Sequence, residues 1–272
     1  DPEVRERAQT LVSQKANQPA VEFIRVRSMG PFELYLGDER VQEGDWKTRK
    51  VKFLAAWILL KAGSSLSEDL VLDQFWPDEL EKGKQNLYWT TSSVRRIFKG
   101  RADGGTDPIL RNLGTLSLNP DLKHWHDVQE LEKLLRHARR ALSDSQPLEY
   151  SRYKTILELY RGPYLEECYL DWAGEIRTRL ARETSAVLEE LAHHAAQASD
   201  QESAAEFAGK LTELDPCHQS AQAIAMRAWL TLERPDRVMK QFEALEQTLR
   251  LELDTEPNLE LVELYYKAKI ML

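Results

Sequence analysis

Hydrophobic residues recur every three or four positions through the second half of the chain, as in amphipathic helices that share a core. Turns, most of which contain Pro or Gly, separate the repeats of this pattern. Bulky residues such as Trp229 are expected in the core rather than in a ligand site. Helix pairs of this kind stack into a solenoid with a concave binding side. The predicted helices span residues 128–144, 147–160, 171–198, 201–214, 217–232, 235–252 and 257–271.

The pattern is different in residues 22–45, where apolar and polar residues alternate as in short strands. Three helices are expected next, and a bend at Gly104-Gly105 then leads into a strand, a turn and a strand in "DPILRNLGTLSLNP". Strands, three helices and a terminal hairpin make the order of a winged helix. The first helix spans Trp46 to Lys61 and has a buried stripe of Val51, Leu54, Ala55, Ile58 and Leu59. The second follows the N-cap Ser67 and has an apolar face of Leu70, Val71 and Phe75. The third runs from about Leu80 to Lys99.

A domain boundary is predicted at "NPDLKHWHD", where turn residues and a helix N-cap end the strand-containing region. The expected fold is mainly α. It has an N-terminal winged helix with a small antiparallel sheet and a C-terminal wing hairpin, followed by an all-α helical array. The expected parts are a linker or the tail of a preceding segment at 1–20, the winged helix at 21–124 and the helical array at 125–272.

Charge is distributed unevenly along the chain, whose formal net charge is −8. Residues 21–125 carry 16 Lys+Arg and 15 Asp+Glu, whereas residues 126–272 carry 18 and 27, so the acidity belongs to the second half. Six cations and no acid nevertheless lie between Lys82 and Arg101. Phosphate would repel acidic residues, so an acid-free basic helix is suited to contact nucleic acid. The same residues also suit an ordinary solvated helix face.

The third helix has two distinct sides when it is wound at about 100° per residue. The side that faces the core is predicted to carry Leu87, Thr91, Val94 and Phe98. The opposite side carries Gln85, Trp89, Ser92 and Arg96, flanked by Lys82 and Lys99, with Lys84 and Arg95 nearer the core edge. Such a helix fits the major groove of B-DNA, where Arg reads guanine and Gln reads adenine. Trp89 has two interpretations, exposure toward sugar and phosphate or packing on the "QFWPDE" turn, and packing is favoured.

The sequence contains no candidate site for catalysis, metal binding or a nucleotide cofactor. Cys168 and Cys217 lie 49 positions apart without a C-x-x-C spacing, and the six histidines lack the spacing of metal ligands. Gly-rich phosphate-binding motifs and G-x-S-x-G do not occur. The longest apolar run, "FLAAWILL", has eight residues, against the roughly 20 that cross a bilayer. We therefore expect a protein that is not an enzyme, without cofactor, metal or membrane contact, in a reducing cytoplasm.

The first half resembles the OmpR-type winged helix of the SARP family, the bacterial antibiotic-regulatory transcription activators. The resemblance is carried by "GPFELYLGDERV", "WKTRKVKFLAAWILLKAGSSLSEDLVLDQFWPDE" and "NLYWTTSSVRRIF". The wing departs from the family, because Gly114-Thr115-Leu116 has threonine where an aromatic residue is usual. The specific elements are Gly30 with Phe32, Trp46 with Arg49 and Lys50, Leu59-Leu60, Leu70, Trp76-Pro77-Asp78, and Leu87 followed by Val94-Arg95-Arg96.

The second half is similar to the bacterial transcriptional activation domain, a tetratricopeptide-like array that follows the winged helix in SARP proteins. The residues that carry this similarity are "ELYRGPYLEE", Asp171-Trp172 with Arg177, "LTELDP" and "TEPNLELVELY". Cys217-His218 departs from the family, where an acidic or apolar residue is usual after Asp-Pro. The two similarities together cover roughly residues 28–270, in the expected order.

This resemblance implies a sequence-specific DNA-binding regulator that activates transcription. In winged helices of this type the third helix enters the major groove and the wing touches the neighbouring minor groove or backbone. The implied base-reading residues are Gln85, Trp89, Ser92, Arg96 and Lys99, and the implied phosphate contacts are Arg49, Lys50, Lys84, Arg95, Arg111 and Asn112. The implied partners are double-stranded DNA, RNA polymerase and a second copy of the chain on direct repeats, in a bacterial cytoplasm.

Two other functions stay open from the sequence. The chain can be a tetratricopeptide-type adaptor of a larger signalling protein, with a winged helix that does not bind DNA. Undetectable duplex binding at about 50 mM salt would favour the adaptor. An enzyme would require an apolar pocket on which carboxylates with perturbed pKa values converge.

Overall fold

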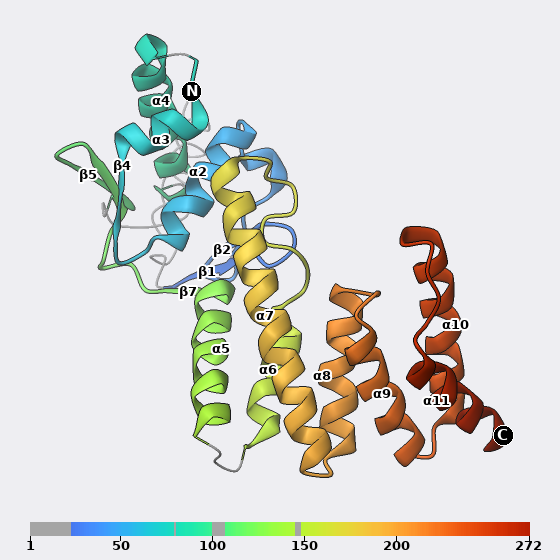
Figure 1. Ribbon diagram of the computed structural model, residues 1–272. Helices are drawn as coiled ribbons and strands as arrows, with labels where there is room; N and C mark the ends of the chain where they lie inside the picture. Colours follow the sequence, from blue (N-terminus) through green and yellow to red (C-terminus); the bar gives the residue numbers. More distant parts are fainter. Residues whose placement is uncertain (1–22, 79, 100–106, 145–147) are drawn as a thin grey trace, which may run out of the picture. The chain divides into compact units, whose positions relative to one another are not determined.

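The computed structural model describes residues 23–78, 80–99, 107–144 and 148–272, apart from the side chains of Leu80, Glu81 and Lys99. Figure 1 labels the helices and strands. The chain divides into two compact units: the first consists of the residues up to Glu130 together with Gly162–Arg177, and the second of Leu131–Arg161 and Thr178–Leu272. The predictions made for residues 1–20, Arg101 and the Gly104-Gly105 bend lie outside the described residues.

The first unit begins with a four-stranded sheet of order β3-β2-β1-β7. β1 pairs antiparallel with β2 and parallel with β7. The alternation that predicted strands places Ile24 and Val26 of β1, and Leu34 and Leu36 of β2, in the core, each at most 4% exposed. β7 was predicted as part of a turn, because three residues are too few to show alternation. The strands are β1 (Ile24–Arg27), β2 (Glu33–Leu36), β3 (Glu39–Arg40) and β7 (His124–His126).

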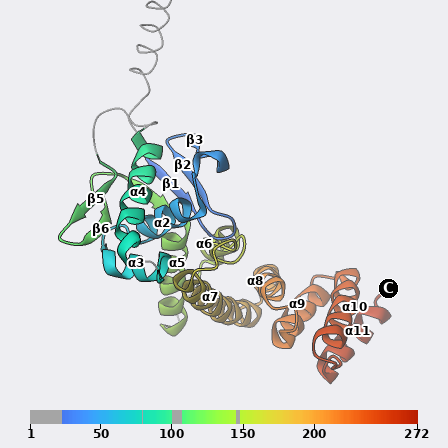
Figure 2. The same cartoon turned by 90° about the horizontal axis from the view of Figure 1, so that it is seen from above.

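Three helices follow the first strands, as predicted: α2 (Arg49–Leu60), α3 (Glu68–Phe75) and α4 (Leu80–Lys99). Figure 2 shows them beside the two small sheets. α2 starts three residues later than predicted, since the Thr48 hydroxyl accepts a hydrogen bond from the Val51 N–H (3.3 Å) and caps the helix there. A short 3₁₀ helix, η1 (Glu43–Asp45), precedes it.

Two details of these helices differ from the prediction. α2 does not bury one stripe only, because every residue from Val51 to Leu59 is buried. It is therefore the central helix of the unit, surrounded on all sides. On α3, Leu70 is 46% exposed, and Leu72 (7% exposed) takes its place in the core beside Val71 and Phe75.

The wing is a three-stranded antiparallel sheet of order β4-β6-β5, made of β4 (Ser65–Ser67), β5 (Ile109–Asn112) and β6 (Thr115–Leu118). The predicted hairpin of β5 and β6 is confirmed. Its turn has positive φ at both central residues, Leu113 (47°) and Gly114 (75°), as in the two-residue turns that match strand twist. β4 was not predicted; "SSLS" lacks the length of an alternating run.

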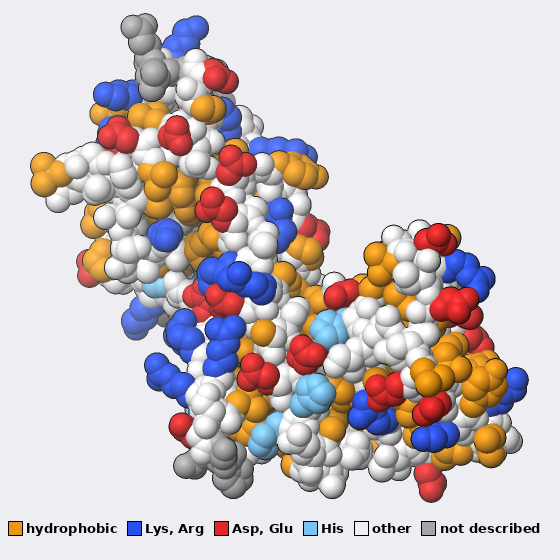
Figure 3. All heavy atoms as spheres, viewed as in Figure 1, with side chains coloured by type: hydrophobic (Ala, Val, Ile, Leu, Met, Phe, Trp, Pro, Cys, Tyr) orange, Lys and Arg blue, Asp and Glu red, His pale blue; other side chains and the backbone are white. Residues whose placement is uncertain are grey.

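The described residues after His126 contain seven helices, whose bounds fall within three residues of the predicted ones. Figure 3 shows hydrophobic side chains at the surface over α10 and α11, where Leu259, Tyr266 and Ile270 are more than half exposed. No described helix is long and apolar enough to cross a membrane. The helices are α5 (Asp127–Ser143), α6 (Tyr150–Leu159), α7 (Asp171–Gln197), α8 (Gln201–Leu214), α9 (Gln219–Thr231), α10 (Pro235–Glu252) and α11 (Leu259–Ile270).

Residues Gly162–Arg177, here called the strap, pack on the winged helix within the first unit. The strap's backbone extends the end of β1: the Gly30 N–H donates to the Pro163 carbonyl (3.0 Å) and the Leu165 N–H to the Ser28 carbonyl (2.8 Å). Arg177 closes the strap on itself by donating to three of its carbonyl oxygens, at 2.7–2.8 Å. The first unit therefore contains a segment that is separated from the rest of the unit in the sequence by residues 131–161.

Candidate nucleic-acid interface

Helix α4 buries the side that its winding predicts. Leu87, Thr91, Val94 and Phe98 are each at most 3% exposed, and Thr90 (1%), Ser93 (2%) and Ile97 (8%) are buried as well. These residues anchor α4 on α2 and α3. The opposite side of the helix is thereby fixed toward solvent.

The exposed side of α4 carries the predicted polar residues. Gln85, Ser92 and Arg96 are exposed, and so are Lys82 and Lys84. From Lys82 to Phe98 the helix has no acidic residue. The side chain of Lys99 lies outside what the structure describes. The face can offer amide, hydroxyl and guanidinium groups to a ligand without repelling phosphate.

Two aromatic residues extend this face. The favoured packing of Trp89 on the preceding turn is wrong: the residue is 50% exposed, and Trp76 (5% exposed) packs there against Phe75 instead, with ring centroids 5.6 Å apart. Tyr88, which the sequence reasoning did not single out, is 55% exposed. The sequence could have indicated this exposure, because Tyr88 lies next to Trp89 on the outer side of the helix.

Arg95 lies at the edge of this face and joins α4 to the wing. Its Nε is 2.8 Å from Oδ1 of Asp107, and its Nη2 donates to the Ile109 carbonyl at 2.8 Å. The side chain is 23% exposed. Asp107 precedes β5 and Ile109 is its first residue, so both contacts hold the start of the wing hairpin against the helix and Arg95 acts first as an internal link.

Arg111 of β5 makes a second link between the wing and the helices. Its guanidinium pairs with the carboxylate of Glu68 on α3 and lies over the ring of Tyr88, 3.8 Å from the centroid. The hydrogen bond that Arg111 donates to the Glu68 carboxylate raises the pKa of Arg111 above its usual value. Arg111 of the wing thus contacts both α3 and α4.

The other predicted phosphate contacts lie in different settings. Lys50 donates to the Phe75 carbonyl at 2.6 Å and its Nζ is 4.9 Å from the ring centroid of Trp76, so it also serves inside the unit. Arg49, Lys84 and Asn112 are exposed on α2, α4 and β5. None of the predicted residues whose side chains are described lies in the core.

Replacing Glu68 with alanine is expected to lower the free energy of unfolding by about 1.5–3 kcal/mol, since a hydrogen bond to a charged group contributes about that much. Glu68 is only 9% exposed, so its carboxylate is held beside Arg111. Alanine would remove this hydrogen-bond acceptor from the guanidinium. Urea denaturation of both proteins measures the difference. Replacement of exposed Asp69, on the same helix, is the matched control; an equal effect of both substitutions would contradict the link.

Chemistry other than binding finds little support in the described residues. No group of three or more His, Cys, Asp or Glu side chains that could hold a metal ion occurs among them. Burial raises the pKa of the Cys168 thiol, which keeps it protonated and unreactive. Among the described residues of α4 and the wing there is no apolar pocket with converging carboxylates, which an enzyme would require.

A winged helix with an exposed basic helix, followed by a helical array, is the architecture of a two-part transcription regulator. Residues 126–269 match the family model of the bacterial transcriptional activator domain, and because this is more than half of the chain, the chain belongs to that family. The predicted similarity of the second half to the bacterial transcriptional activation domain is thereby confirmed. The family is one of transcriptional regulators rather than a known enzyme family.

One solved structure extends the comparison to the winged helix. The chain is similar to Mycobacterium tuberculosis EmbR in a complex with a low affinity phosphopeptide, with a TM-score of 0.60 and 14% sequence identity. The similarity covers 91% of this chain and 65% of the EmbR chain, so the chain spans slightly less than two thirds of EmbR. At this identity the similarity shows the fold. No curated protein matches the sequence.

Proposed function

We propose that the chain regulates transcription by binding specific DNA sequences, with the outer face of α4 in the major groove. The observation that carries the proposal is the exposed, acid-free side of α4 with Gln85, Ser92 and Arg96 in its centre. Membership of a transcriptional activator family supports it. An α-helix fits the major groove, and these side chains can form hydrogen bonds to base edges there.

Base-reading and phosphate-binding roles are distributed according to what each side chain already contacts. We propose Gln85, Trp89, Ser92, Arg96 and Lys99 as base readers, and Arg49, Lys84 and Asn112 as phosphate contacts. Arg95 and Arg111 already have carboxylate partners, so a phosphate would compete with Asp107 and Glu68. Together with Lys50 they are better suited to hold the wing and the turn before α4 in position for binding.

Partners of the helical array follow from the family rather than from a described contact. We propose RNA polymerase as a partner and side-by-side dimers on repeated DNA sites, with DNA in the bacterial cytoplasm as the place of action. The alternative is a tetratricopeptide-type adaptor. Its discriminating property is the absence of duplex binding at low salt, where phosphate contacts are strongest.

Substitution of Arg96 by alanine is expected to weaken binding to the specific duplex by about 1–3 kcal/mol, because a lost bidentate contact to guanine costs about that much. The duplex is first selected from genomic fragments with the unchanged protein. Fluorescence titration at two salt concentrations then gives the affinities. The matched control is Arg139→Ala, an exposed arginine on α5, which should leave the affinity unchanged.

Three outcomes separate the interpretations of Arg96. A loss confined to the selected duplex supports base reading. An equal loss on unrelated duplexes would make Arg96 a phosphate contact, and the slope of affinity against salt would then fall by about one unit. No detectable duplex binding of the unchanged protein at about 50 mM salt would overturn the proposed function and favour the adaptor.

A further inference from the structure

The second unit contains a groove of about 520 Å³ that the proposed DNA binding does not use. This volume is in the range of about 300–1,000 Å³ that is usual for ligand sites. Figure 1 shows α8 with α6 and α9 on either side of it, and both neighbours contact it. The side chains that line the groove belong to α6 (Leu157), α8 (Glu202, Ala205, Glu206, Gly209, Lys210, Glu213), α9 (Trp229), the turn after it (Leu232, Arg234) and α10 (Arg237).

The floor of the groove is one face of α8, whose lining residues follow each other at helical spacing from Glu202 to Glu213. At about 1.5 Å per residue this floor is about 16 Å long, which is the length of about five residues of extended peptide. Leu157, Trp229 and Leu232 are the larger apolar side chains along it, and all three are partly exposed. Trp229, which the sequence placed in the core, packs against the core of α9, α10 and α11 and also lines the groove. The groove therefore suits a short extended segment with an apolar side chain.

Gly209 in the middle of this floor has no structural reason to be glycine. No heavy atom lies within 4 Å of the position that its Cβ would take, and its φ is an ordinary helical one. Glycine inside a helix is less favourable than alanine. A glycine there is useful where a ligand backbone has to approach the helix closely. The empty space above Gly209 points to such a ligand.

The charges in the groove are only partly compensated within the unit. Glu206 pairs with Lys154 at 2.8 Å and Glu213 with Lys210 at 2.9 Å. In the described part of the chain Arg234 and Arg237 are exposed and have no acidic side chain within ion-pair distance. Glu202 has no basic side chain within that distance, but its charge acts on Lys154. The two arginines are the uncompensated charges of the groove, and they favour a ligand that carries carboxylates.

We propose that this groove binds a short acidic peptide segment of a partner protein. Its backbone crosses Gly209, one apolar side chain packs on Trp229 and Leu157, and its carboxylates pair with the guanidinium groups of Arg234 and Arg237. Arginine recognises carboxylates through paired N–H donors, which makes these the specificity-determining contacts. The proposal is independent of DNA binding, since every lining residue belongs to the second unit.

A synthetic array of random octapeptides, probed with the full chain, tests the groove. Peptides that combine Asp or Glu with an aliphatic or aromatic residue should be enriched, and the affinity of the best one is then measured by fluorescence anisotropy. The double variant Arg234→Gln, Arg237→Gln should bind it at least about tenfold more weakly. Arg139→Gln, outside the groove, should bind it unchanged.

Gly209→Ala separates a ligand site from a merely structural glycine. Alanine should raise the urea concentration at the unfolding midpoint, because it favours the helix, and it should weaken peptide binding by about tenfold, because its methyl group occupies the space above the floor. An array without enrichment, enrichment of basic peptides, or full peptide affinity of Gly209→Ala or of the double arginine variant would each overturn the proposal.

Discussion

Replacing Asp127 with alanine is expected to lower the free energy of unfolding by about 3–5 kcal/mol, as the loss of a buried charged partner does. Asp127 is 1% exposed. Its carboxylate accepts hydrogen bonds from the backbone N–H of Ser28 (2.8 and 3.0 Å), Met29 (2.9 Å) and Val128 (2.8 Å). Alanine would leave buried N–H groups at the end of β1 without an acceptor. Urea denaturation at pH 7, followed by tryptophan fluorescence, measures the loss.

The stabilisation by Asp127 should depend on pH, and the direction of its pKa shift determines whether the stabilisation is lost at low or at high pH. Burial raises the pKa of Asp127, but the hydrogen bond and charge interaction with His126 and the N–H donors of Met29 and Ser28 outweigh it, and the pKa lies below its usual value. A carboxylate with a lowered pKa in the folded state stabilises fully above its unfolded pKa of about 3.9 and loses this effect as the pH falls through the folded pKa.

Comparison with Asp127→Asn isolates this titration, since asparagine has nearly the same size and no charge to lose. The difference in free energy of unfolding between the two proteins should shrink as the pH falls below about pH 4. The matched control is Asp73→Ala, an exposed carboxylate on α3, with an expected change within about 0.5 kcal/mol. A difference that does not vary with pH would contradict the role assigned to the charge of Asp127.

The long helices could be predicted from the sequence because each repeats its period several times. α4 spans five turns or more, so its buried and exposed sides followed from winding alone. The seven helices of the array were predicted for the same reason. β4 and β7 were missed since each has three residues, and their pairing depends on partners elsewhere in the chain.

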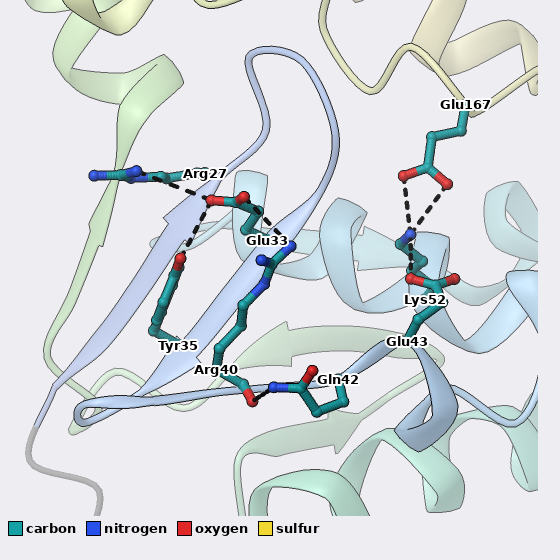
Figure 4. Close-up of polar contacts among 8 residues, drawn as sticks. All are labelled: Arg27, Glu33, Tyr35, Arg40, Gln42, Glu43, Lys52 and Glu167. Atoms are coloured by element: carbon teal, nitrogen blue, oxygen red, sulfur yellow. Dashed lines mark hydrogen bonds and ion pairs between the residues drawn. The ribbon is translucent and has the colours of Figure 1, made fainter.

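Lys52 shows why the burial of α2 escaped the prediction. A lysine between apolar residues indicates a solvated side of a helix, yet this side chain is 3% exposed. Its Nζ lies 2.9 Å from carboxylate oxygens of both Glu43 and Glu167 (Figure 4). Glu167 is 115 positions away in the sequence. The sequence around Lys52 cannot predict an ion pair with a residue so far away in the chain.

The candidate interface was predictable to the same extent. Winding showed which side of α4 faces solvent, but it could not show which cations already have partners. Arg95 and Arg111 find Asp107 and Glu68 on other elements, and these pairs form only when the wing folds against α3 and α4. Exposure is a property of one helix, whereas pairing is a property of the assembled unit.

The motifs of the two halves meet in the strap, which sequence periodicity could not reveal. Gly30 belongs to the first set of family residues and Gly162 to the second, and a Cβ on Gly162 would lie 3.3 Å from Cα of Gly30. The backbones approach this closely because neither residue has a side chain. Residues that looked like signatures of separate domains therefore include contacts within one folded unit.

Trp172→Ala is expected to lower the free energy of unfolding by about 3–5 kcal/mol, the usual cost of removing a buried tryptophan. Trp172 of the strap is 6% exposed and stacks on Trp57 of α2, with ring centroids 4.8 Å apart and planes at 6°. Trp57 in turn stacks on Phe75 of α3 at 6.1 Å. These three stacked rings connect the strap to the centre of the winged helix. Alanine at position 172 would leave a cavity that the other two rings cannot fill.

Tyr169→Ala provides the matched control for Trp172, because this aromatic residue lies on the same strap but is 85% exposed. Its loss should change the free energy of unfolding by less than about 0.5 kcal/mol. Trp172→Phe should retain part of the stacking and fall between the two. If Trp172→Ala and Tyr169→Ala unfold at the same urea concentration, the stacking of Trp172 on Trp57 contributes nothing to the stability of the first unit. A large difference instead means that a winged helix cut off before Gly162 would lack part of its own core.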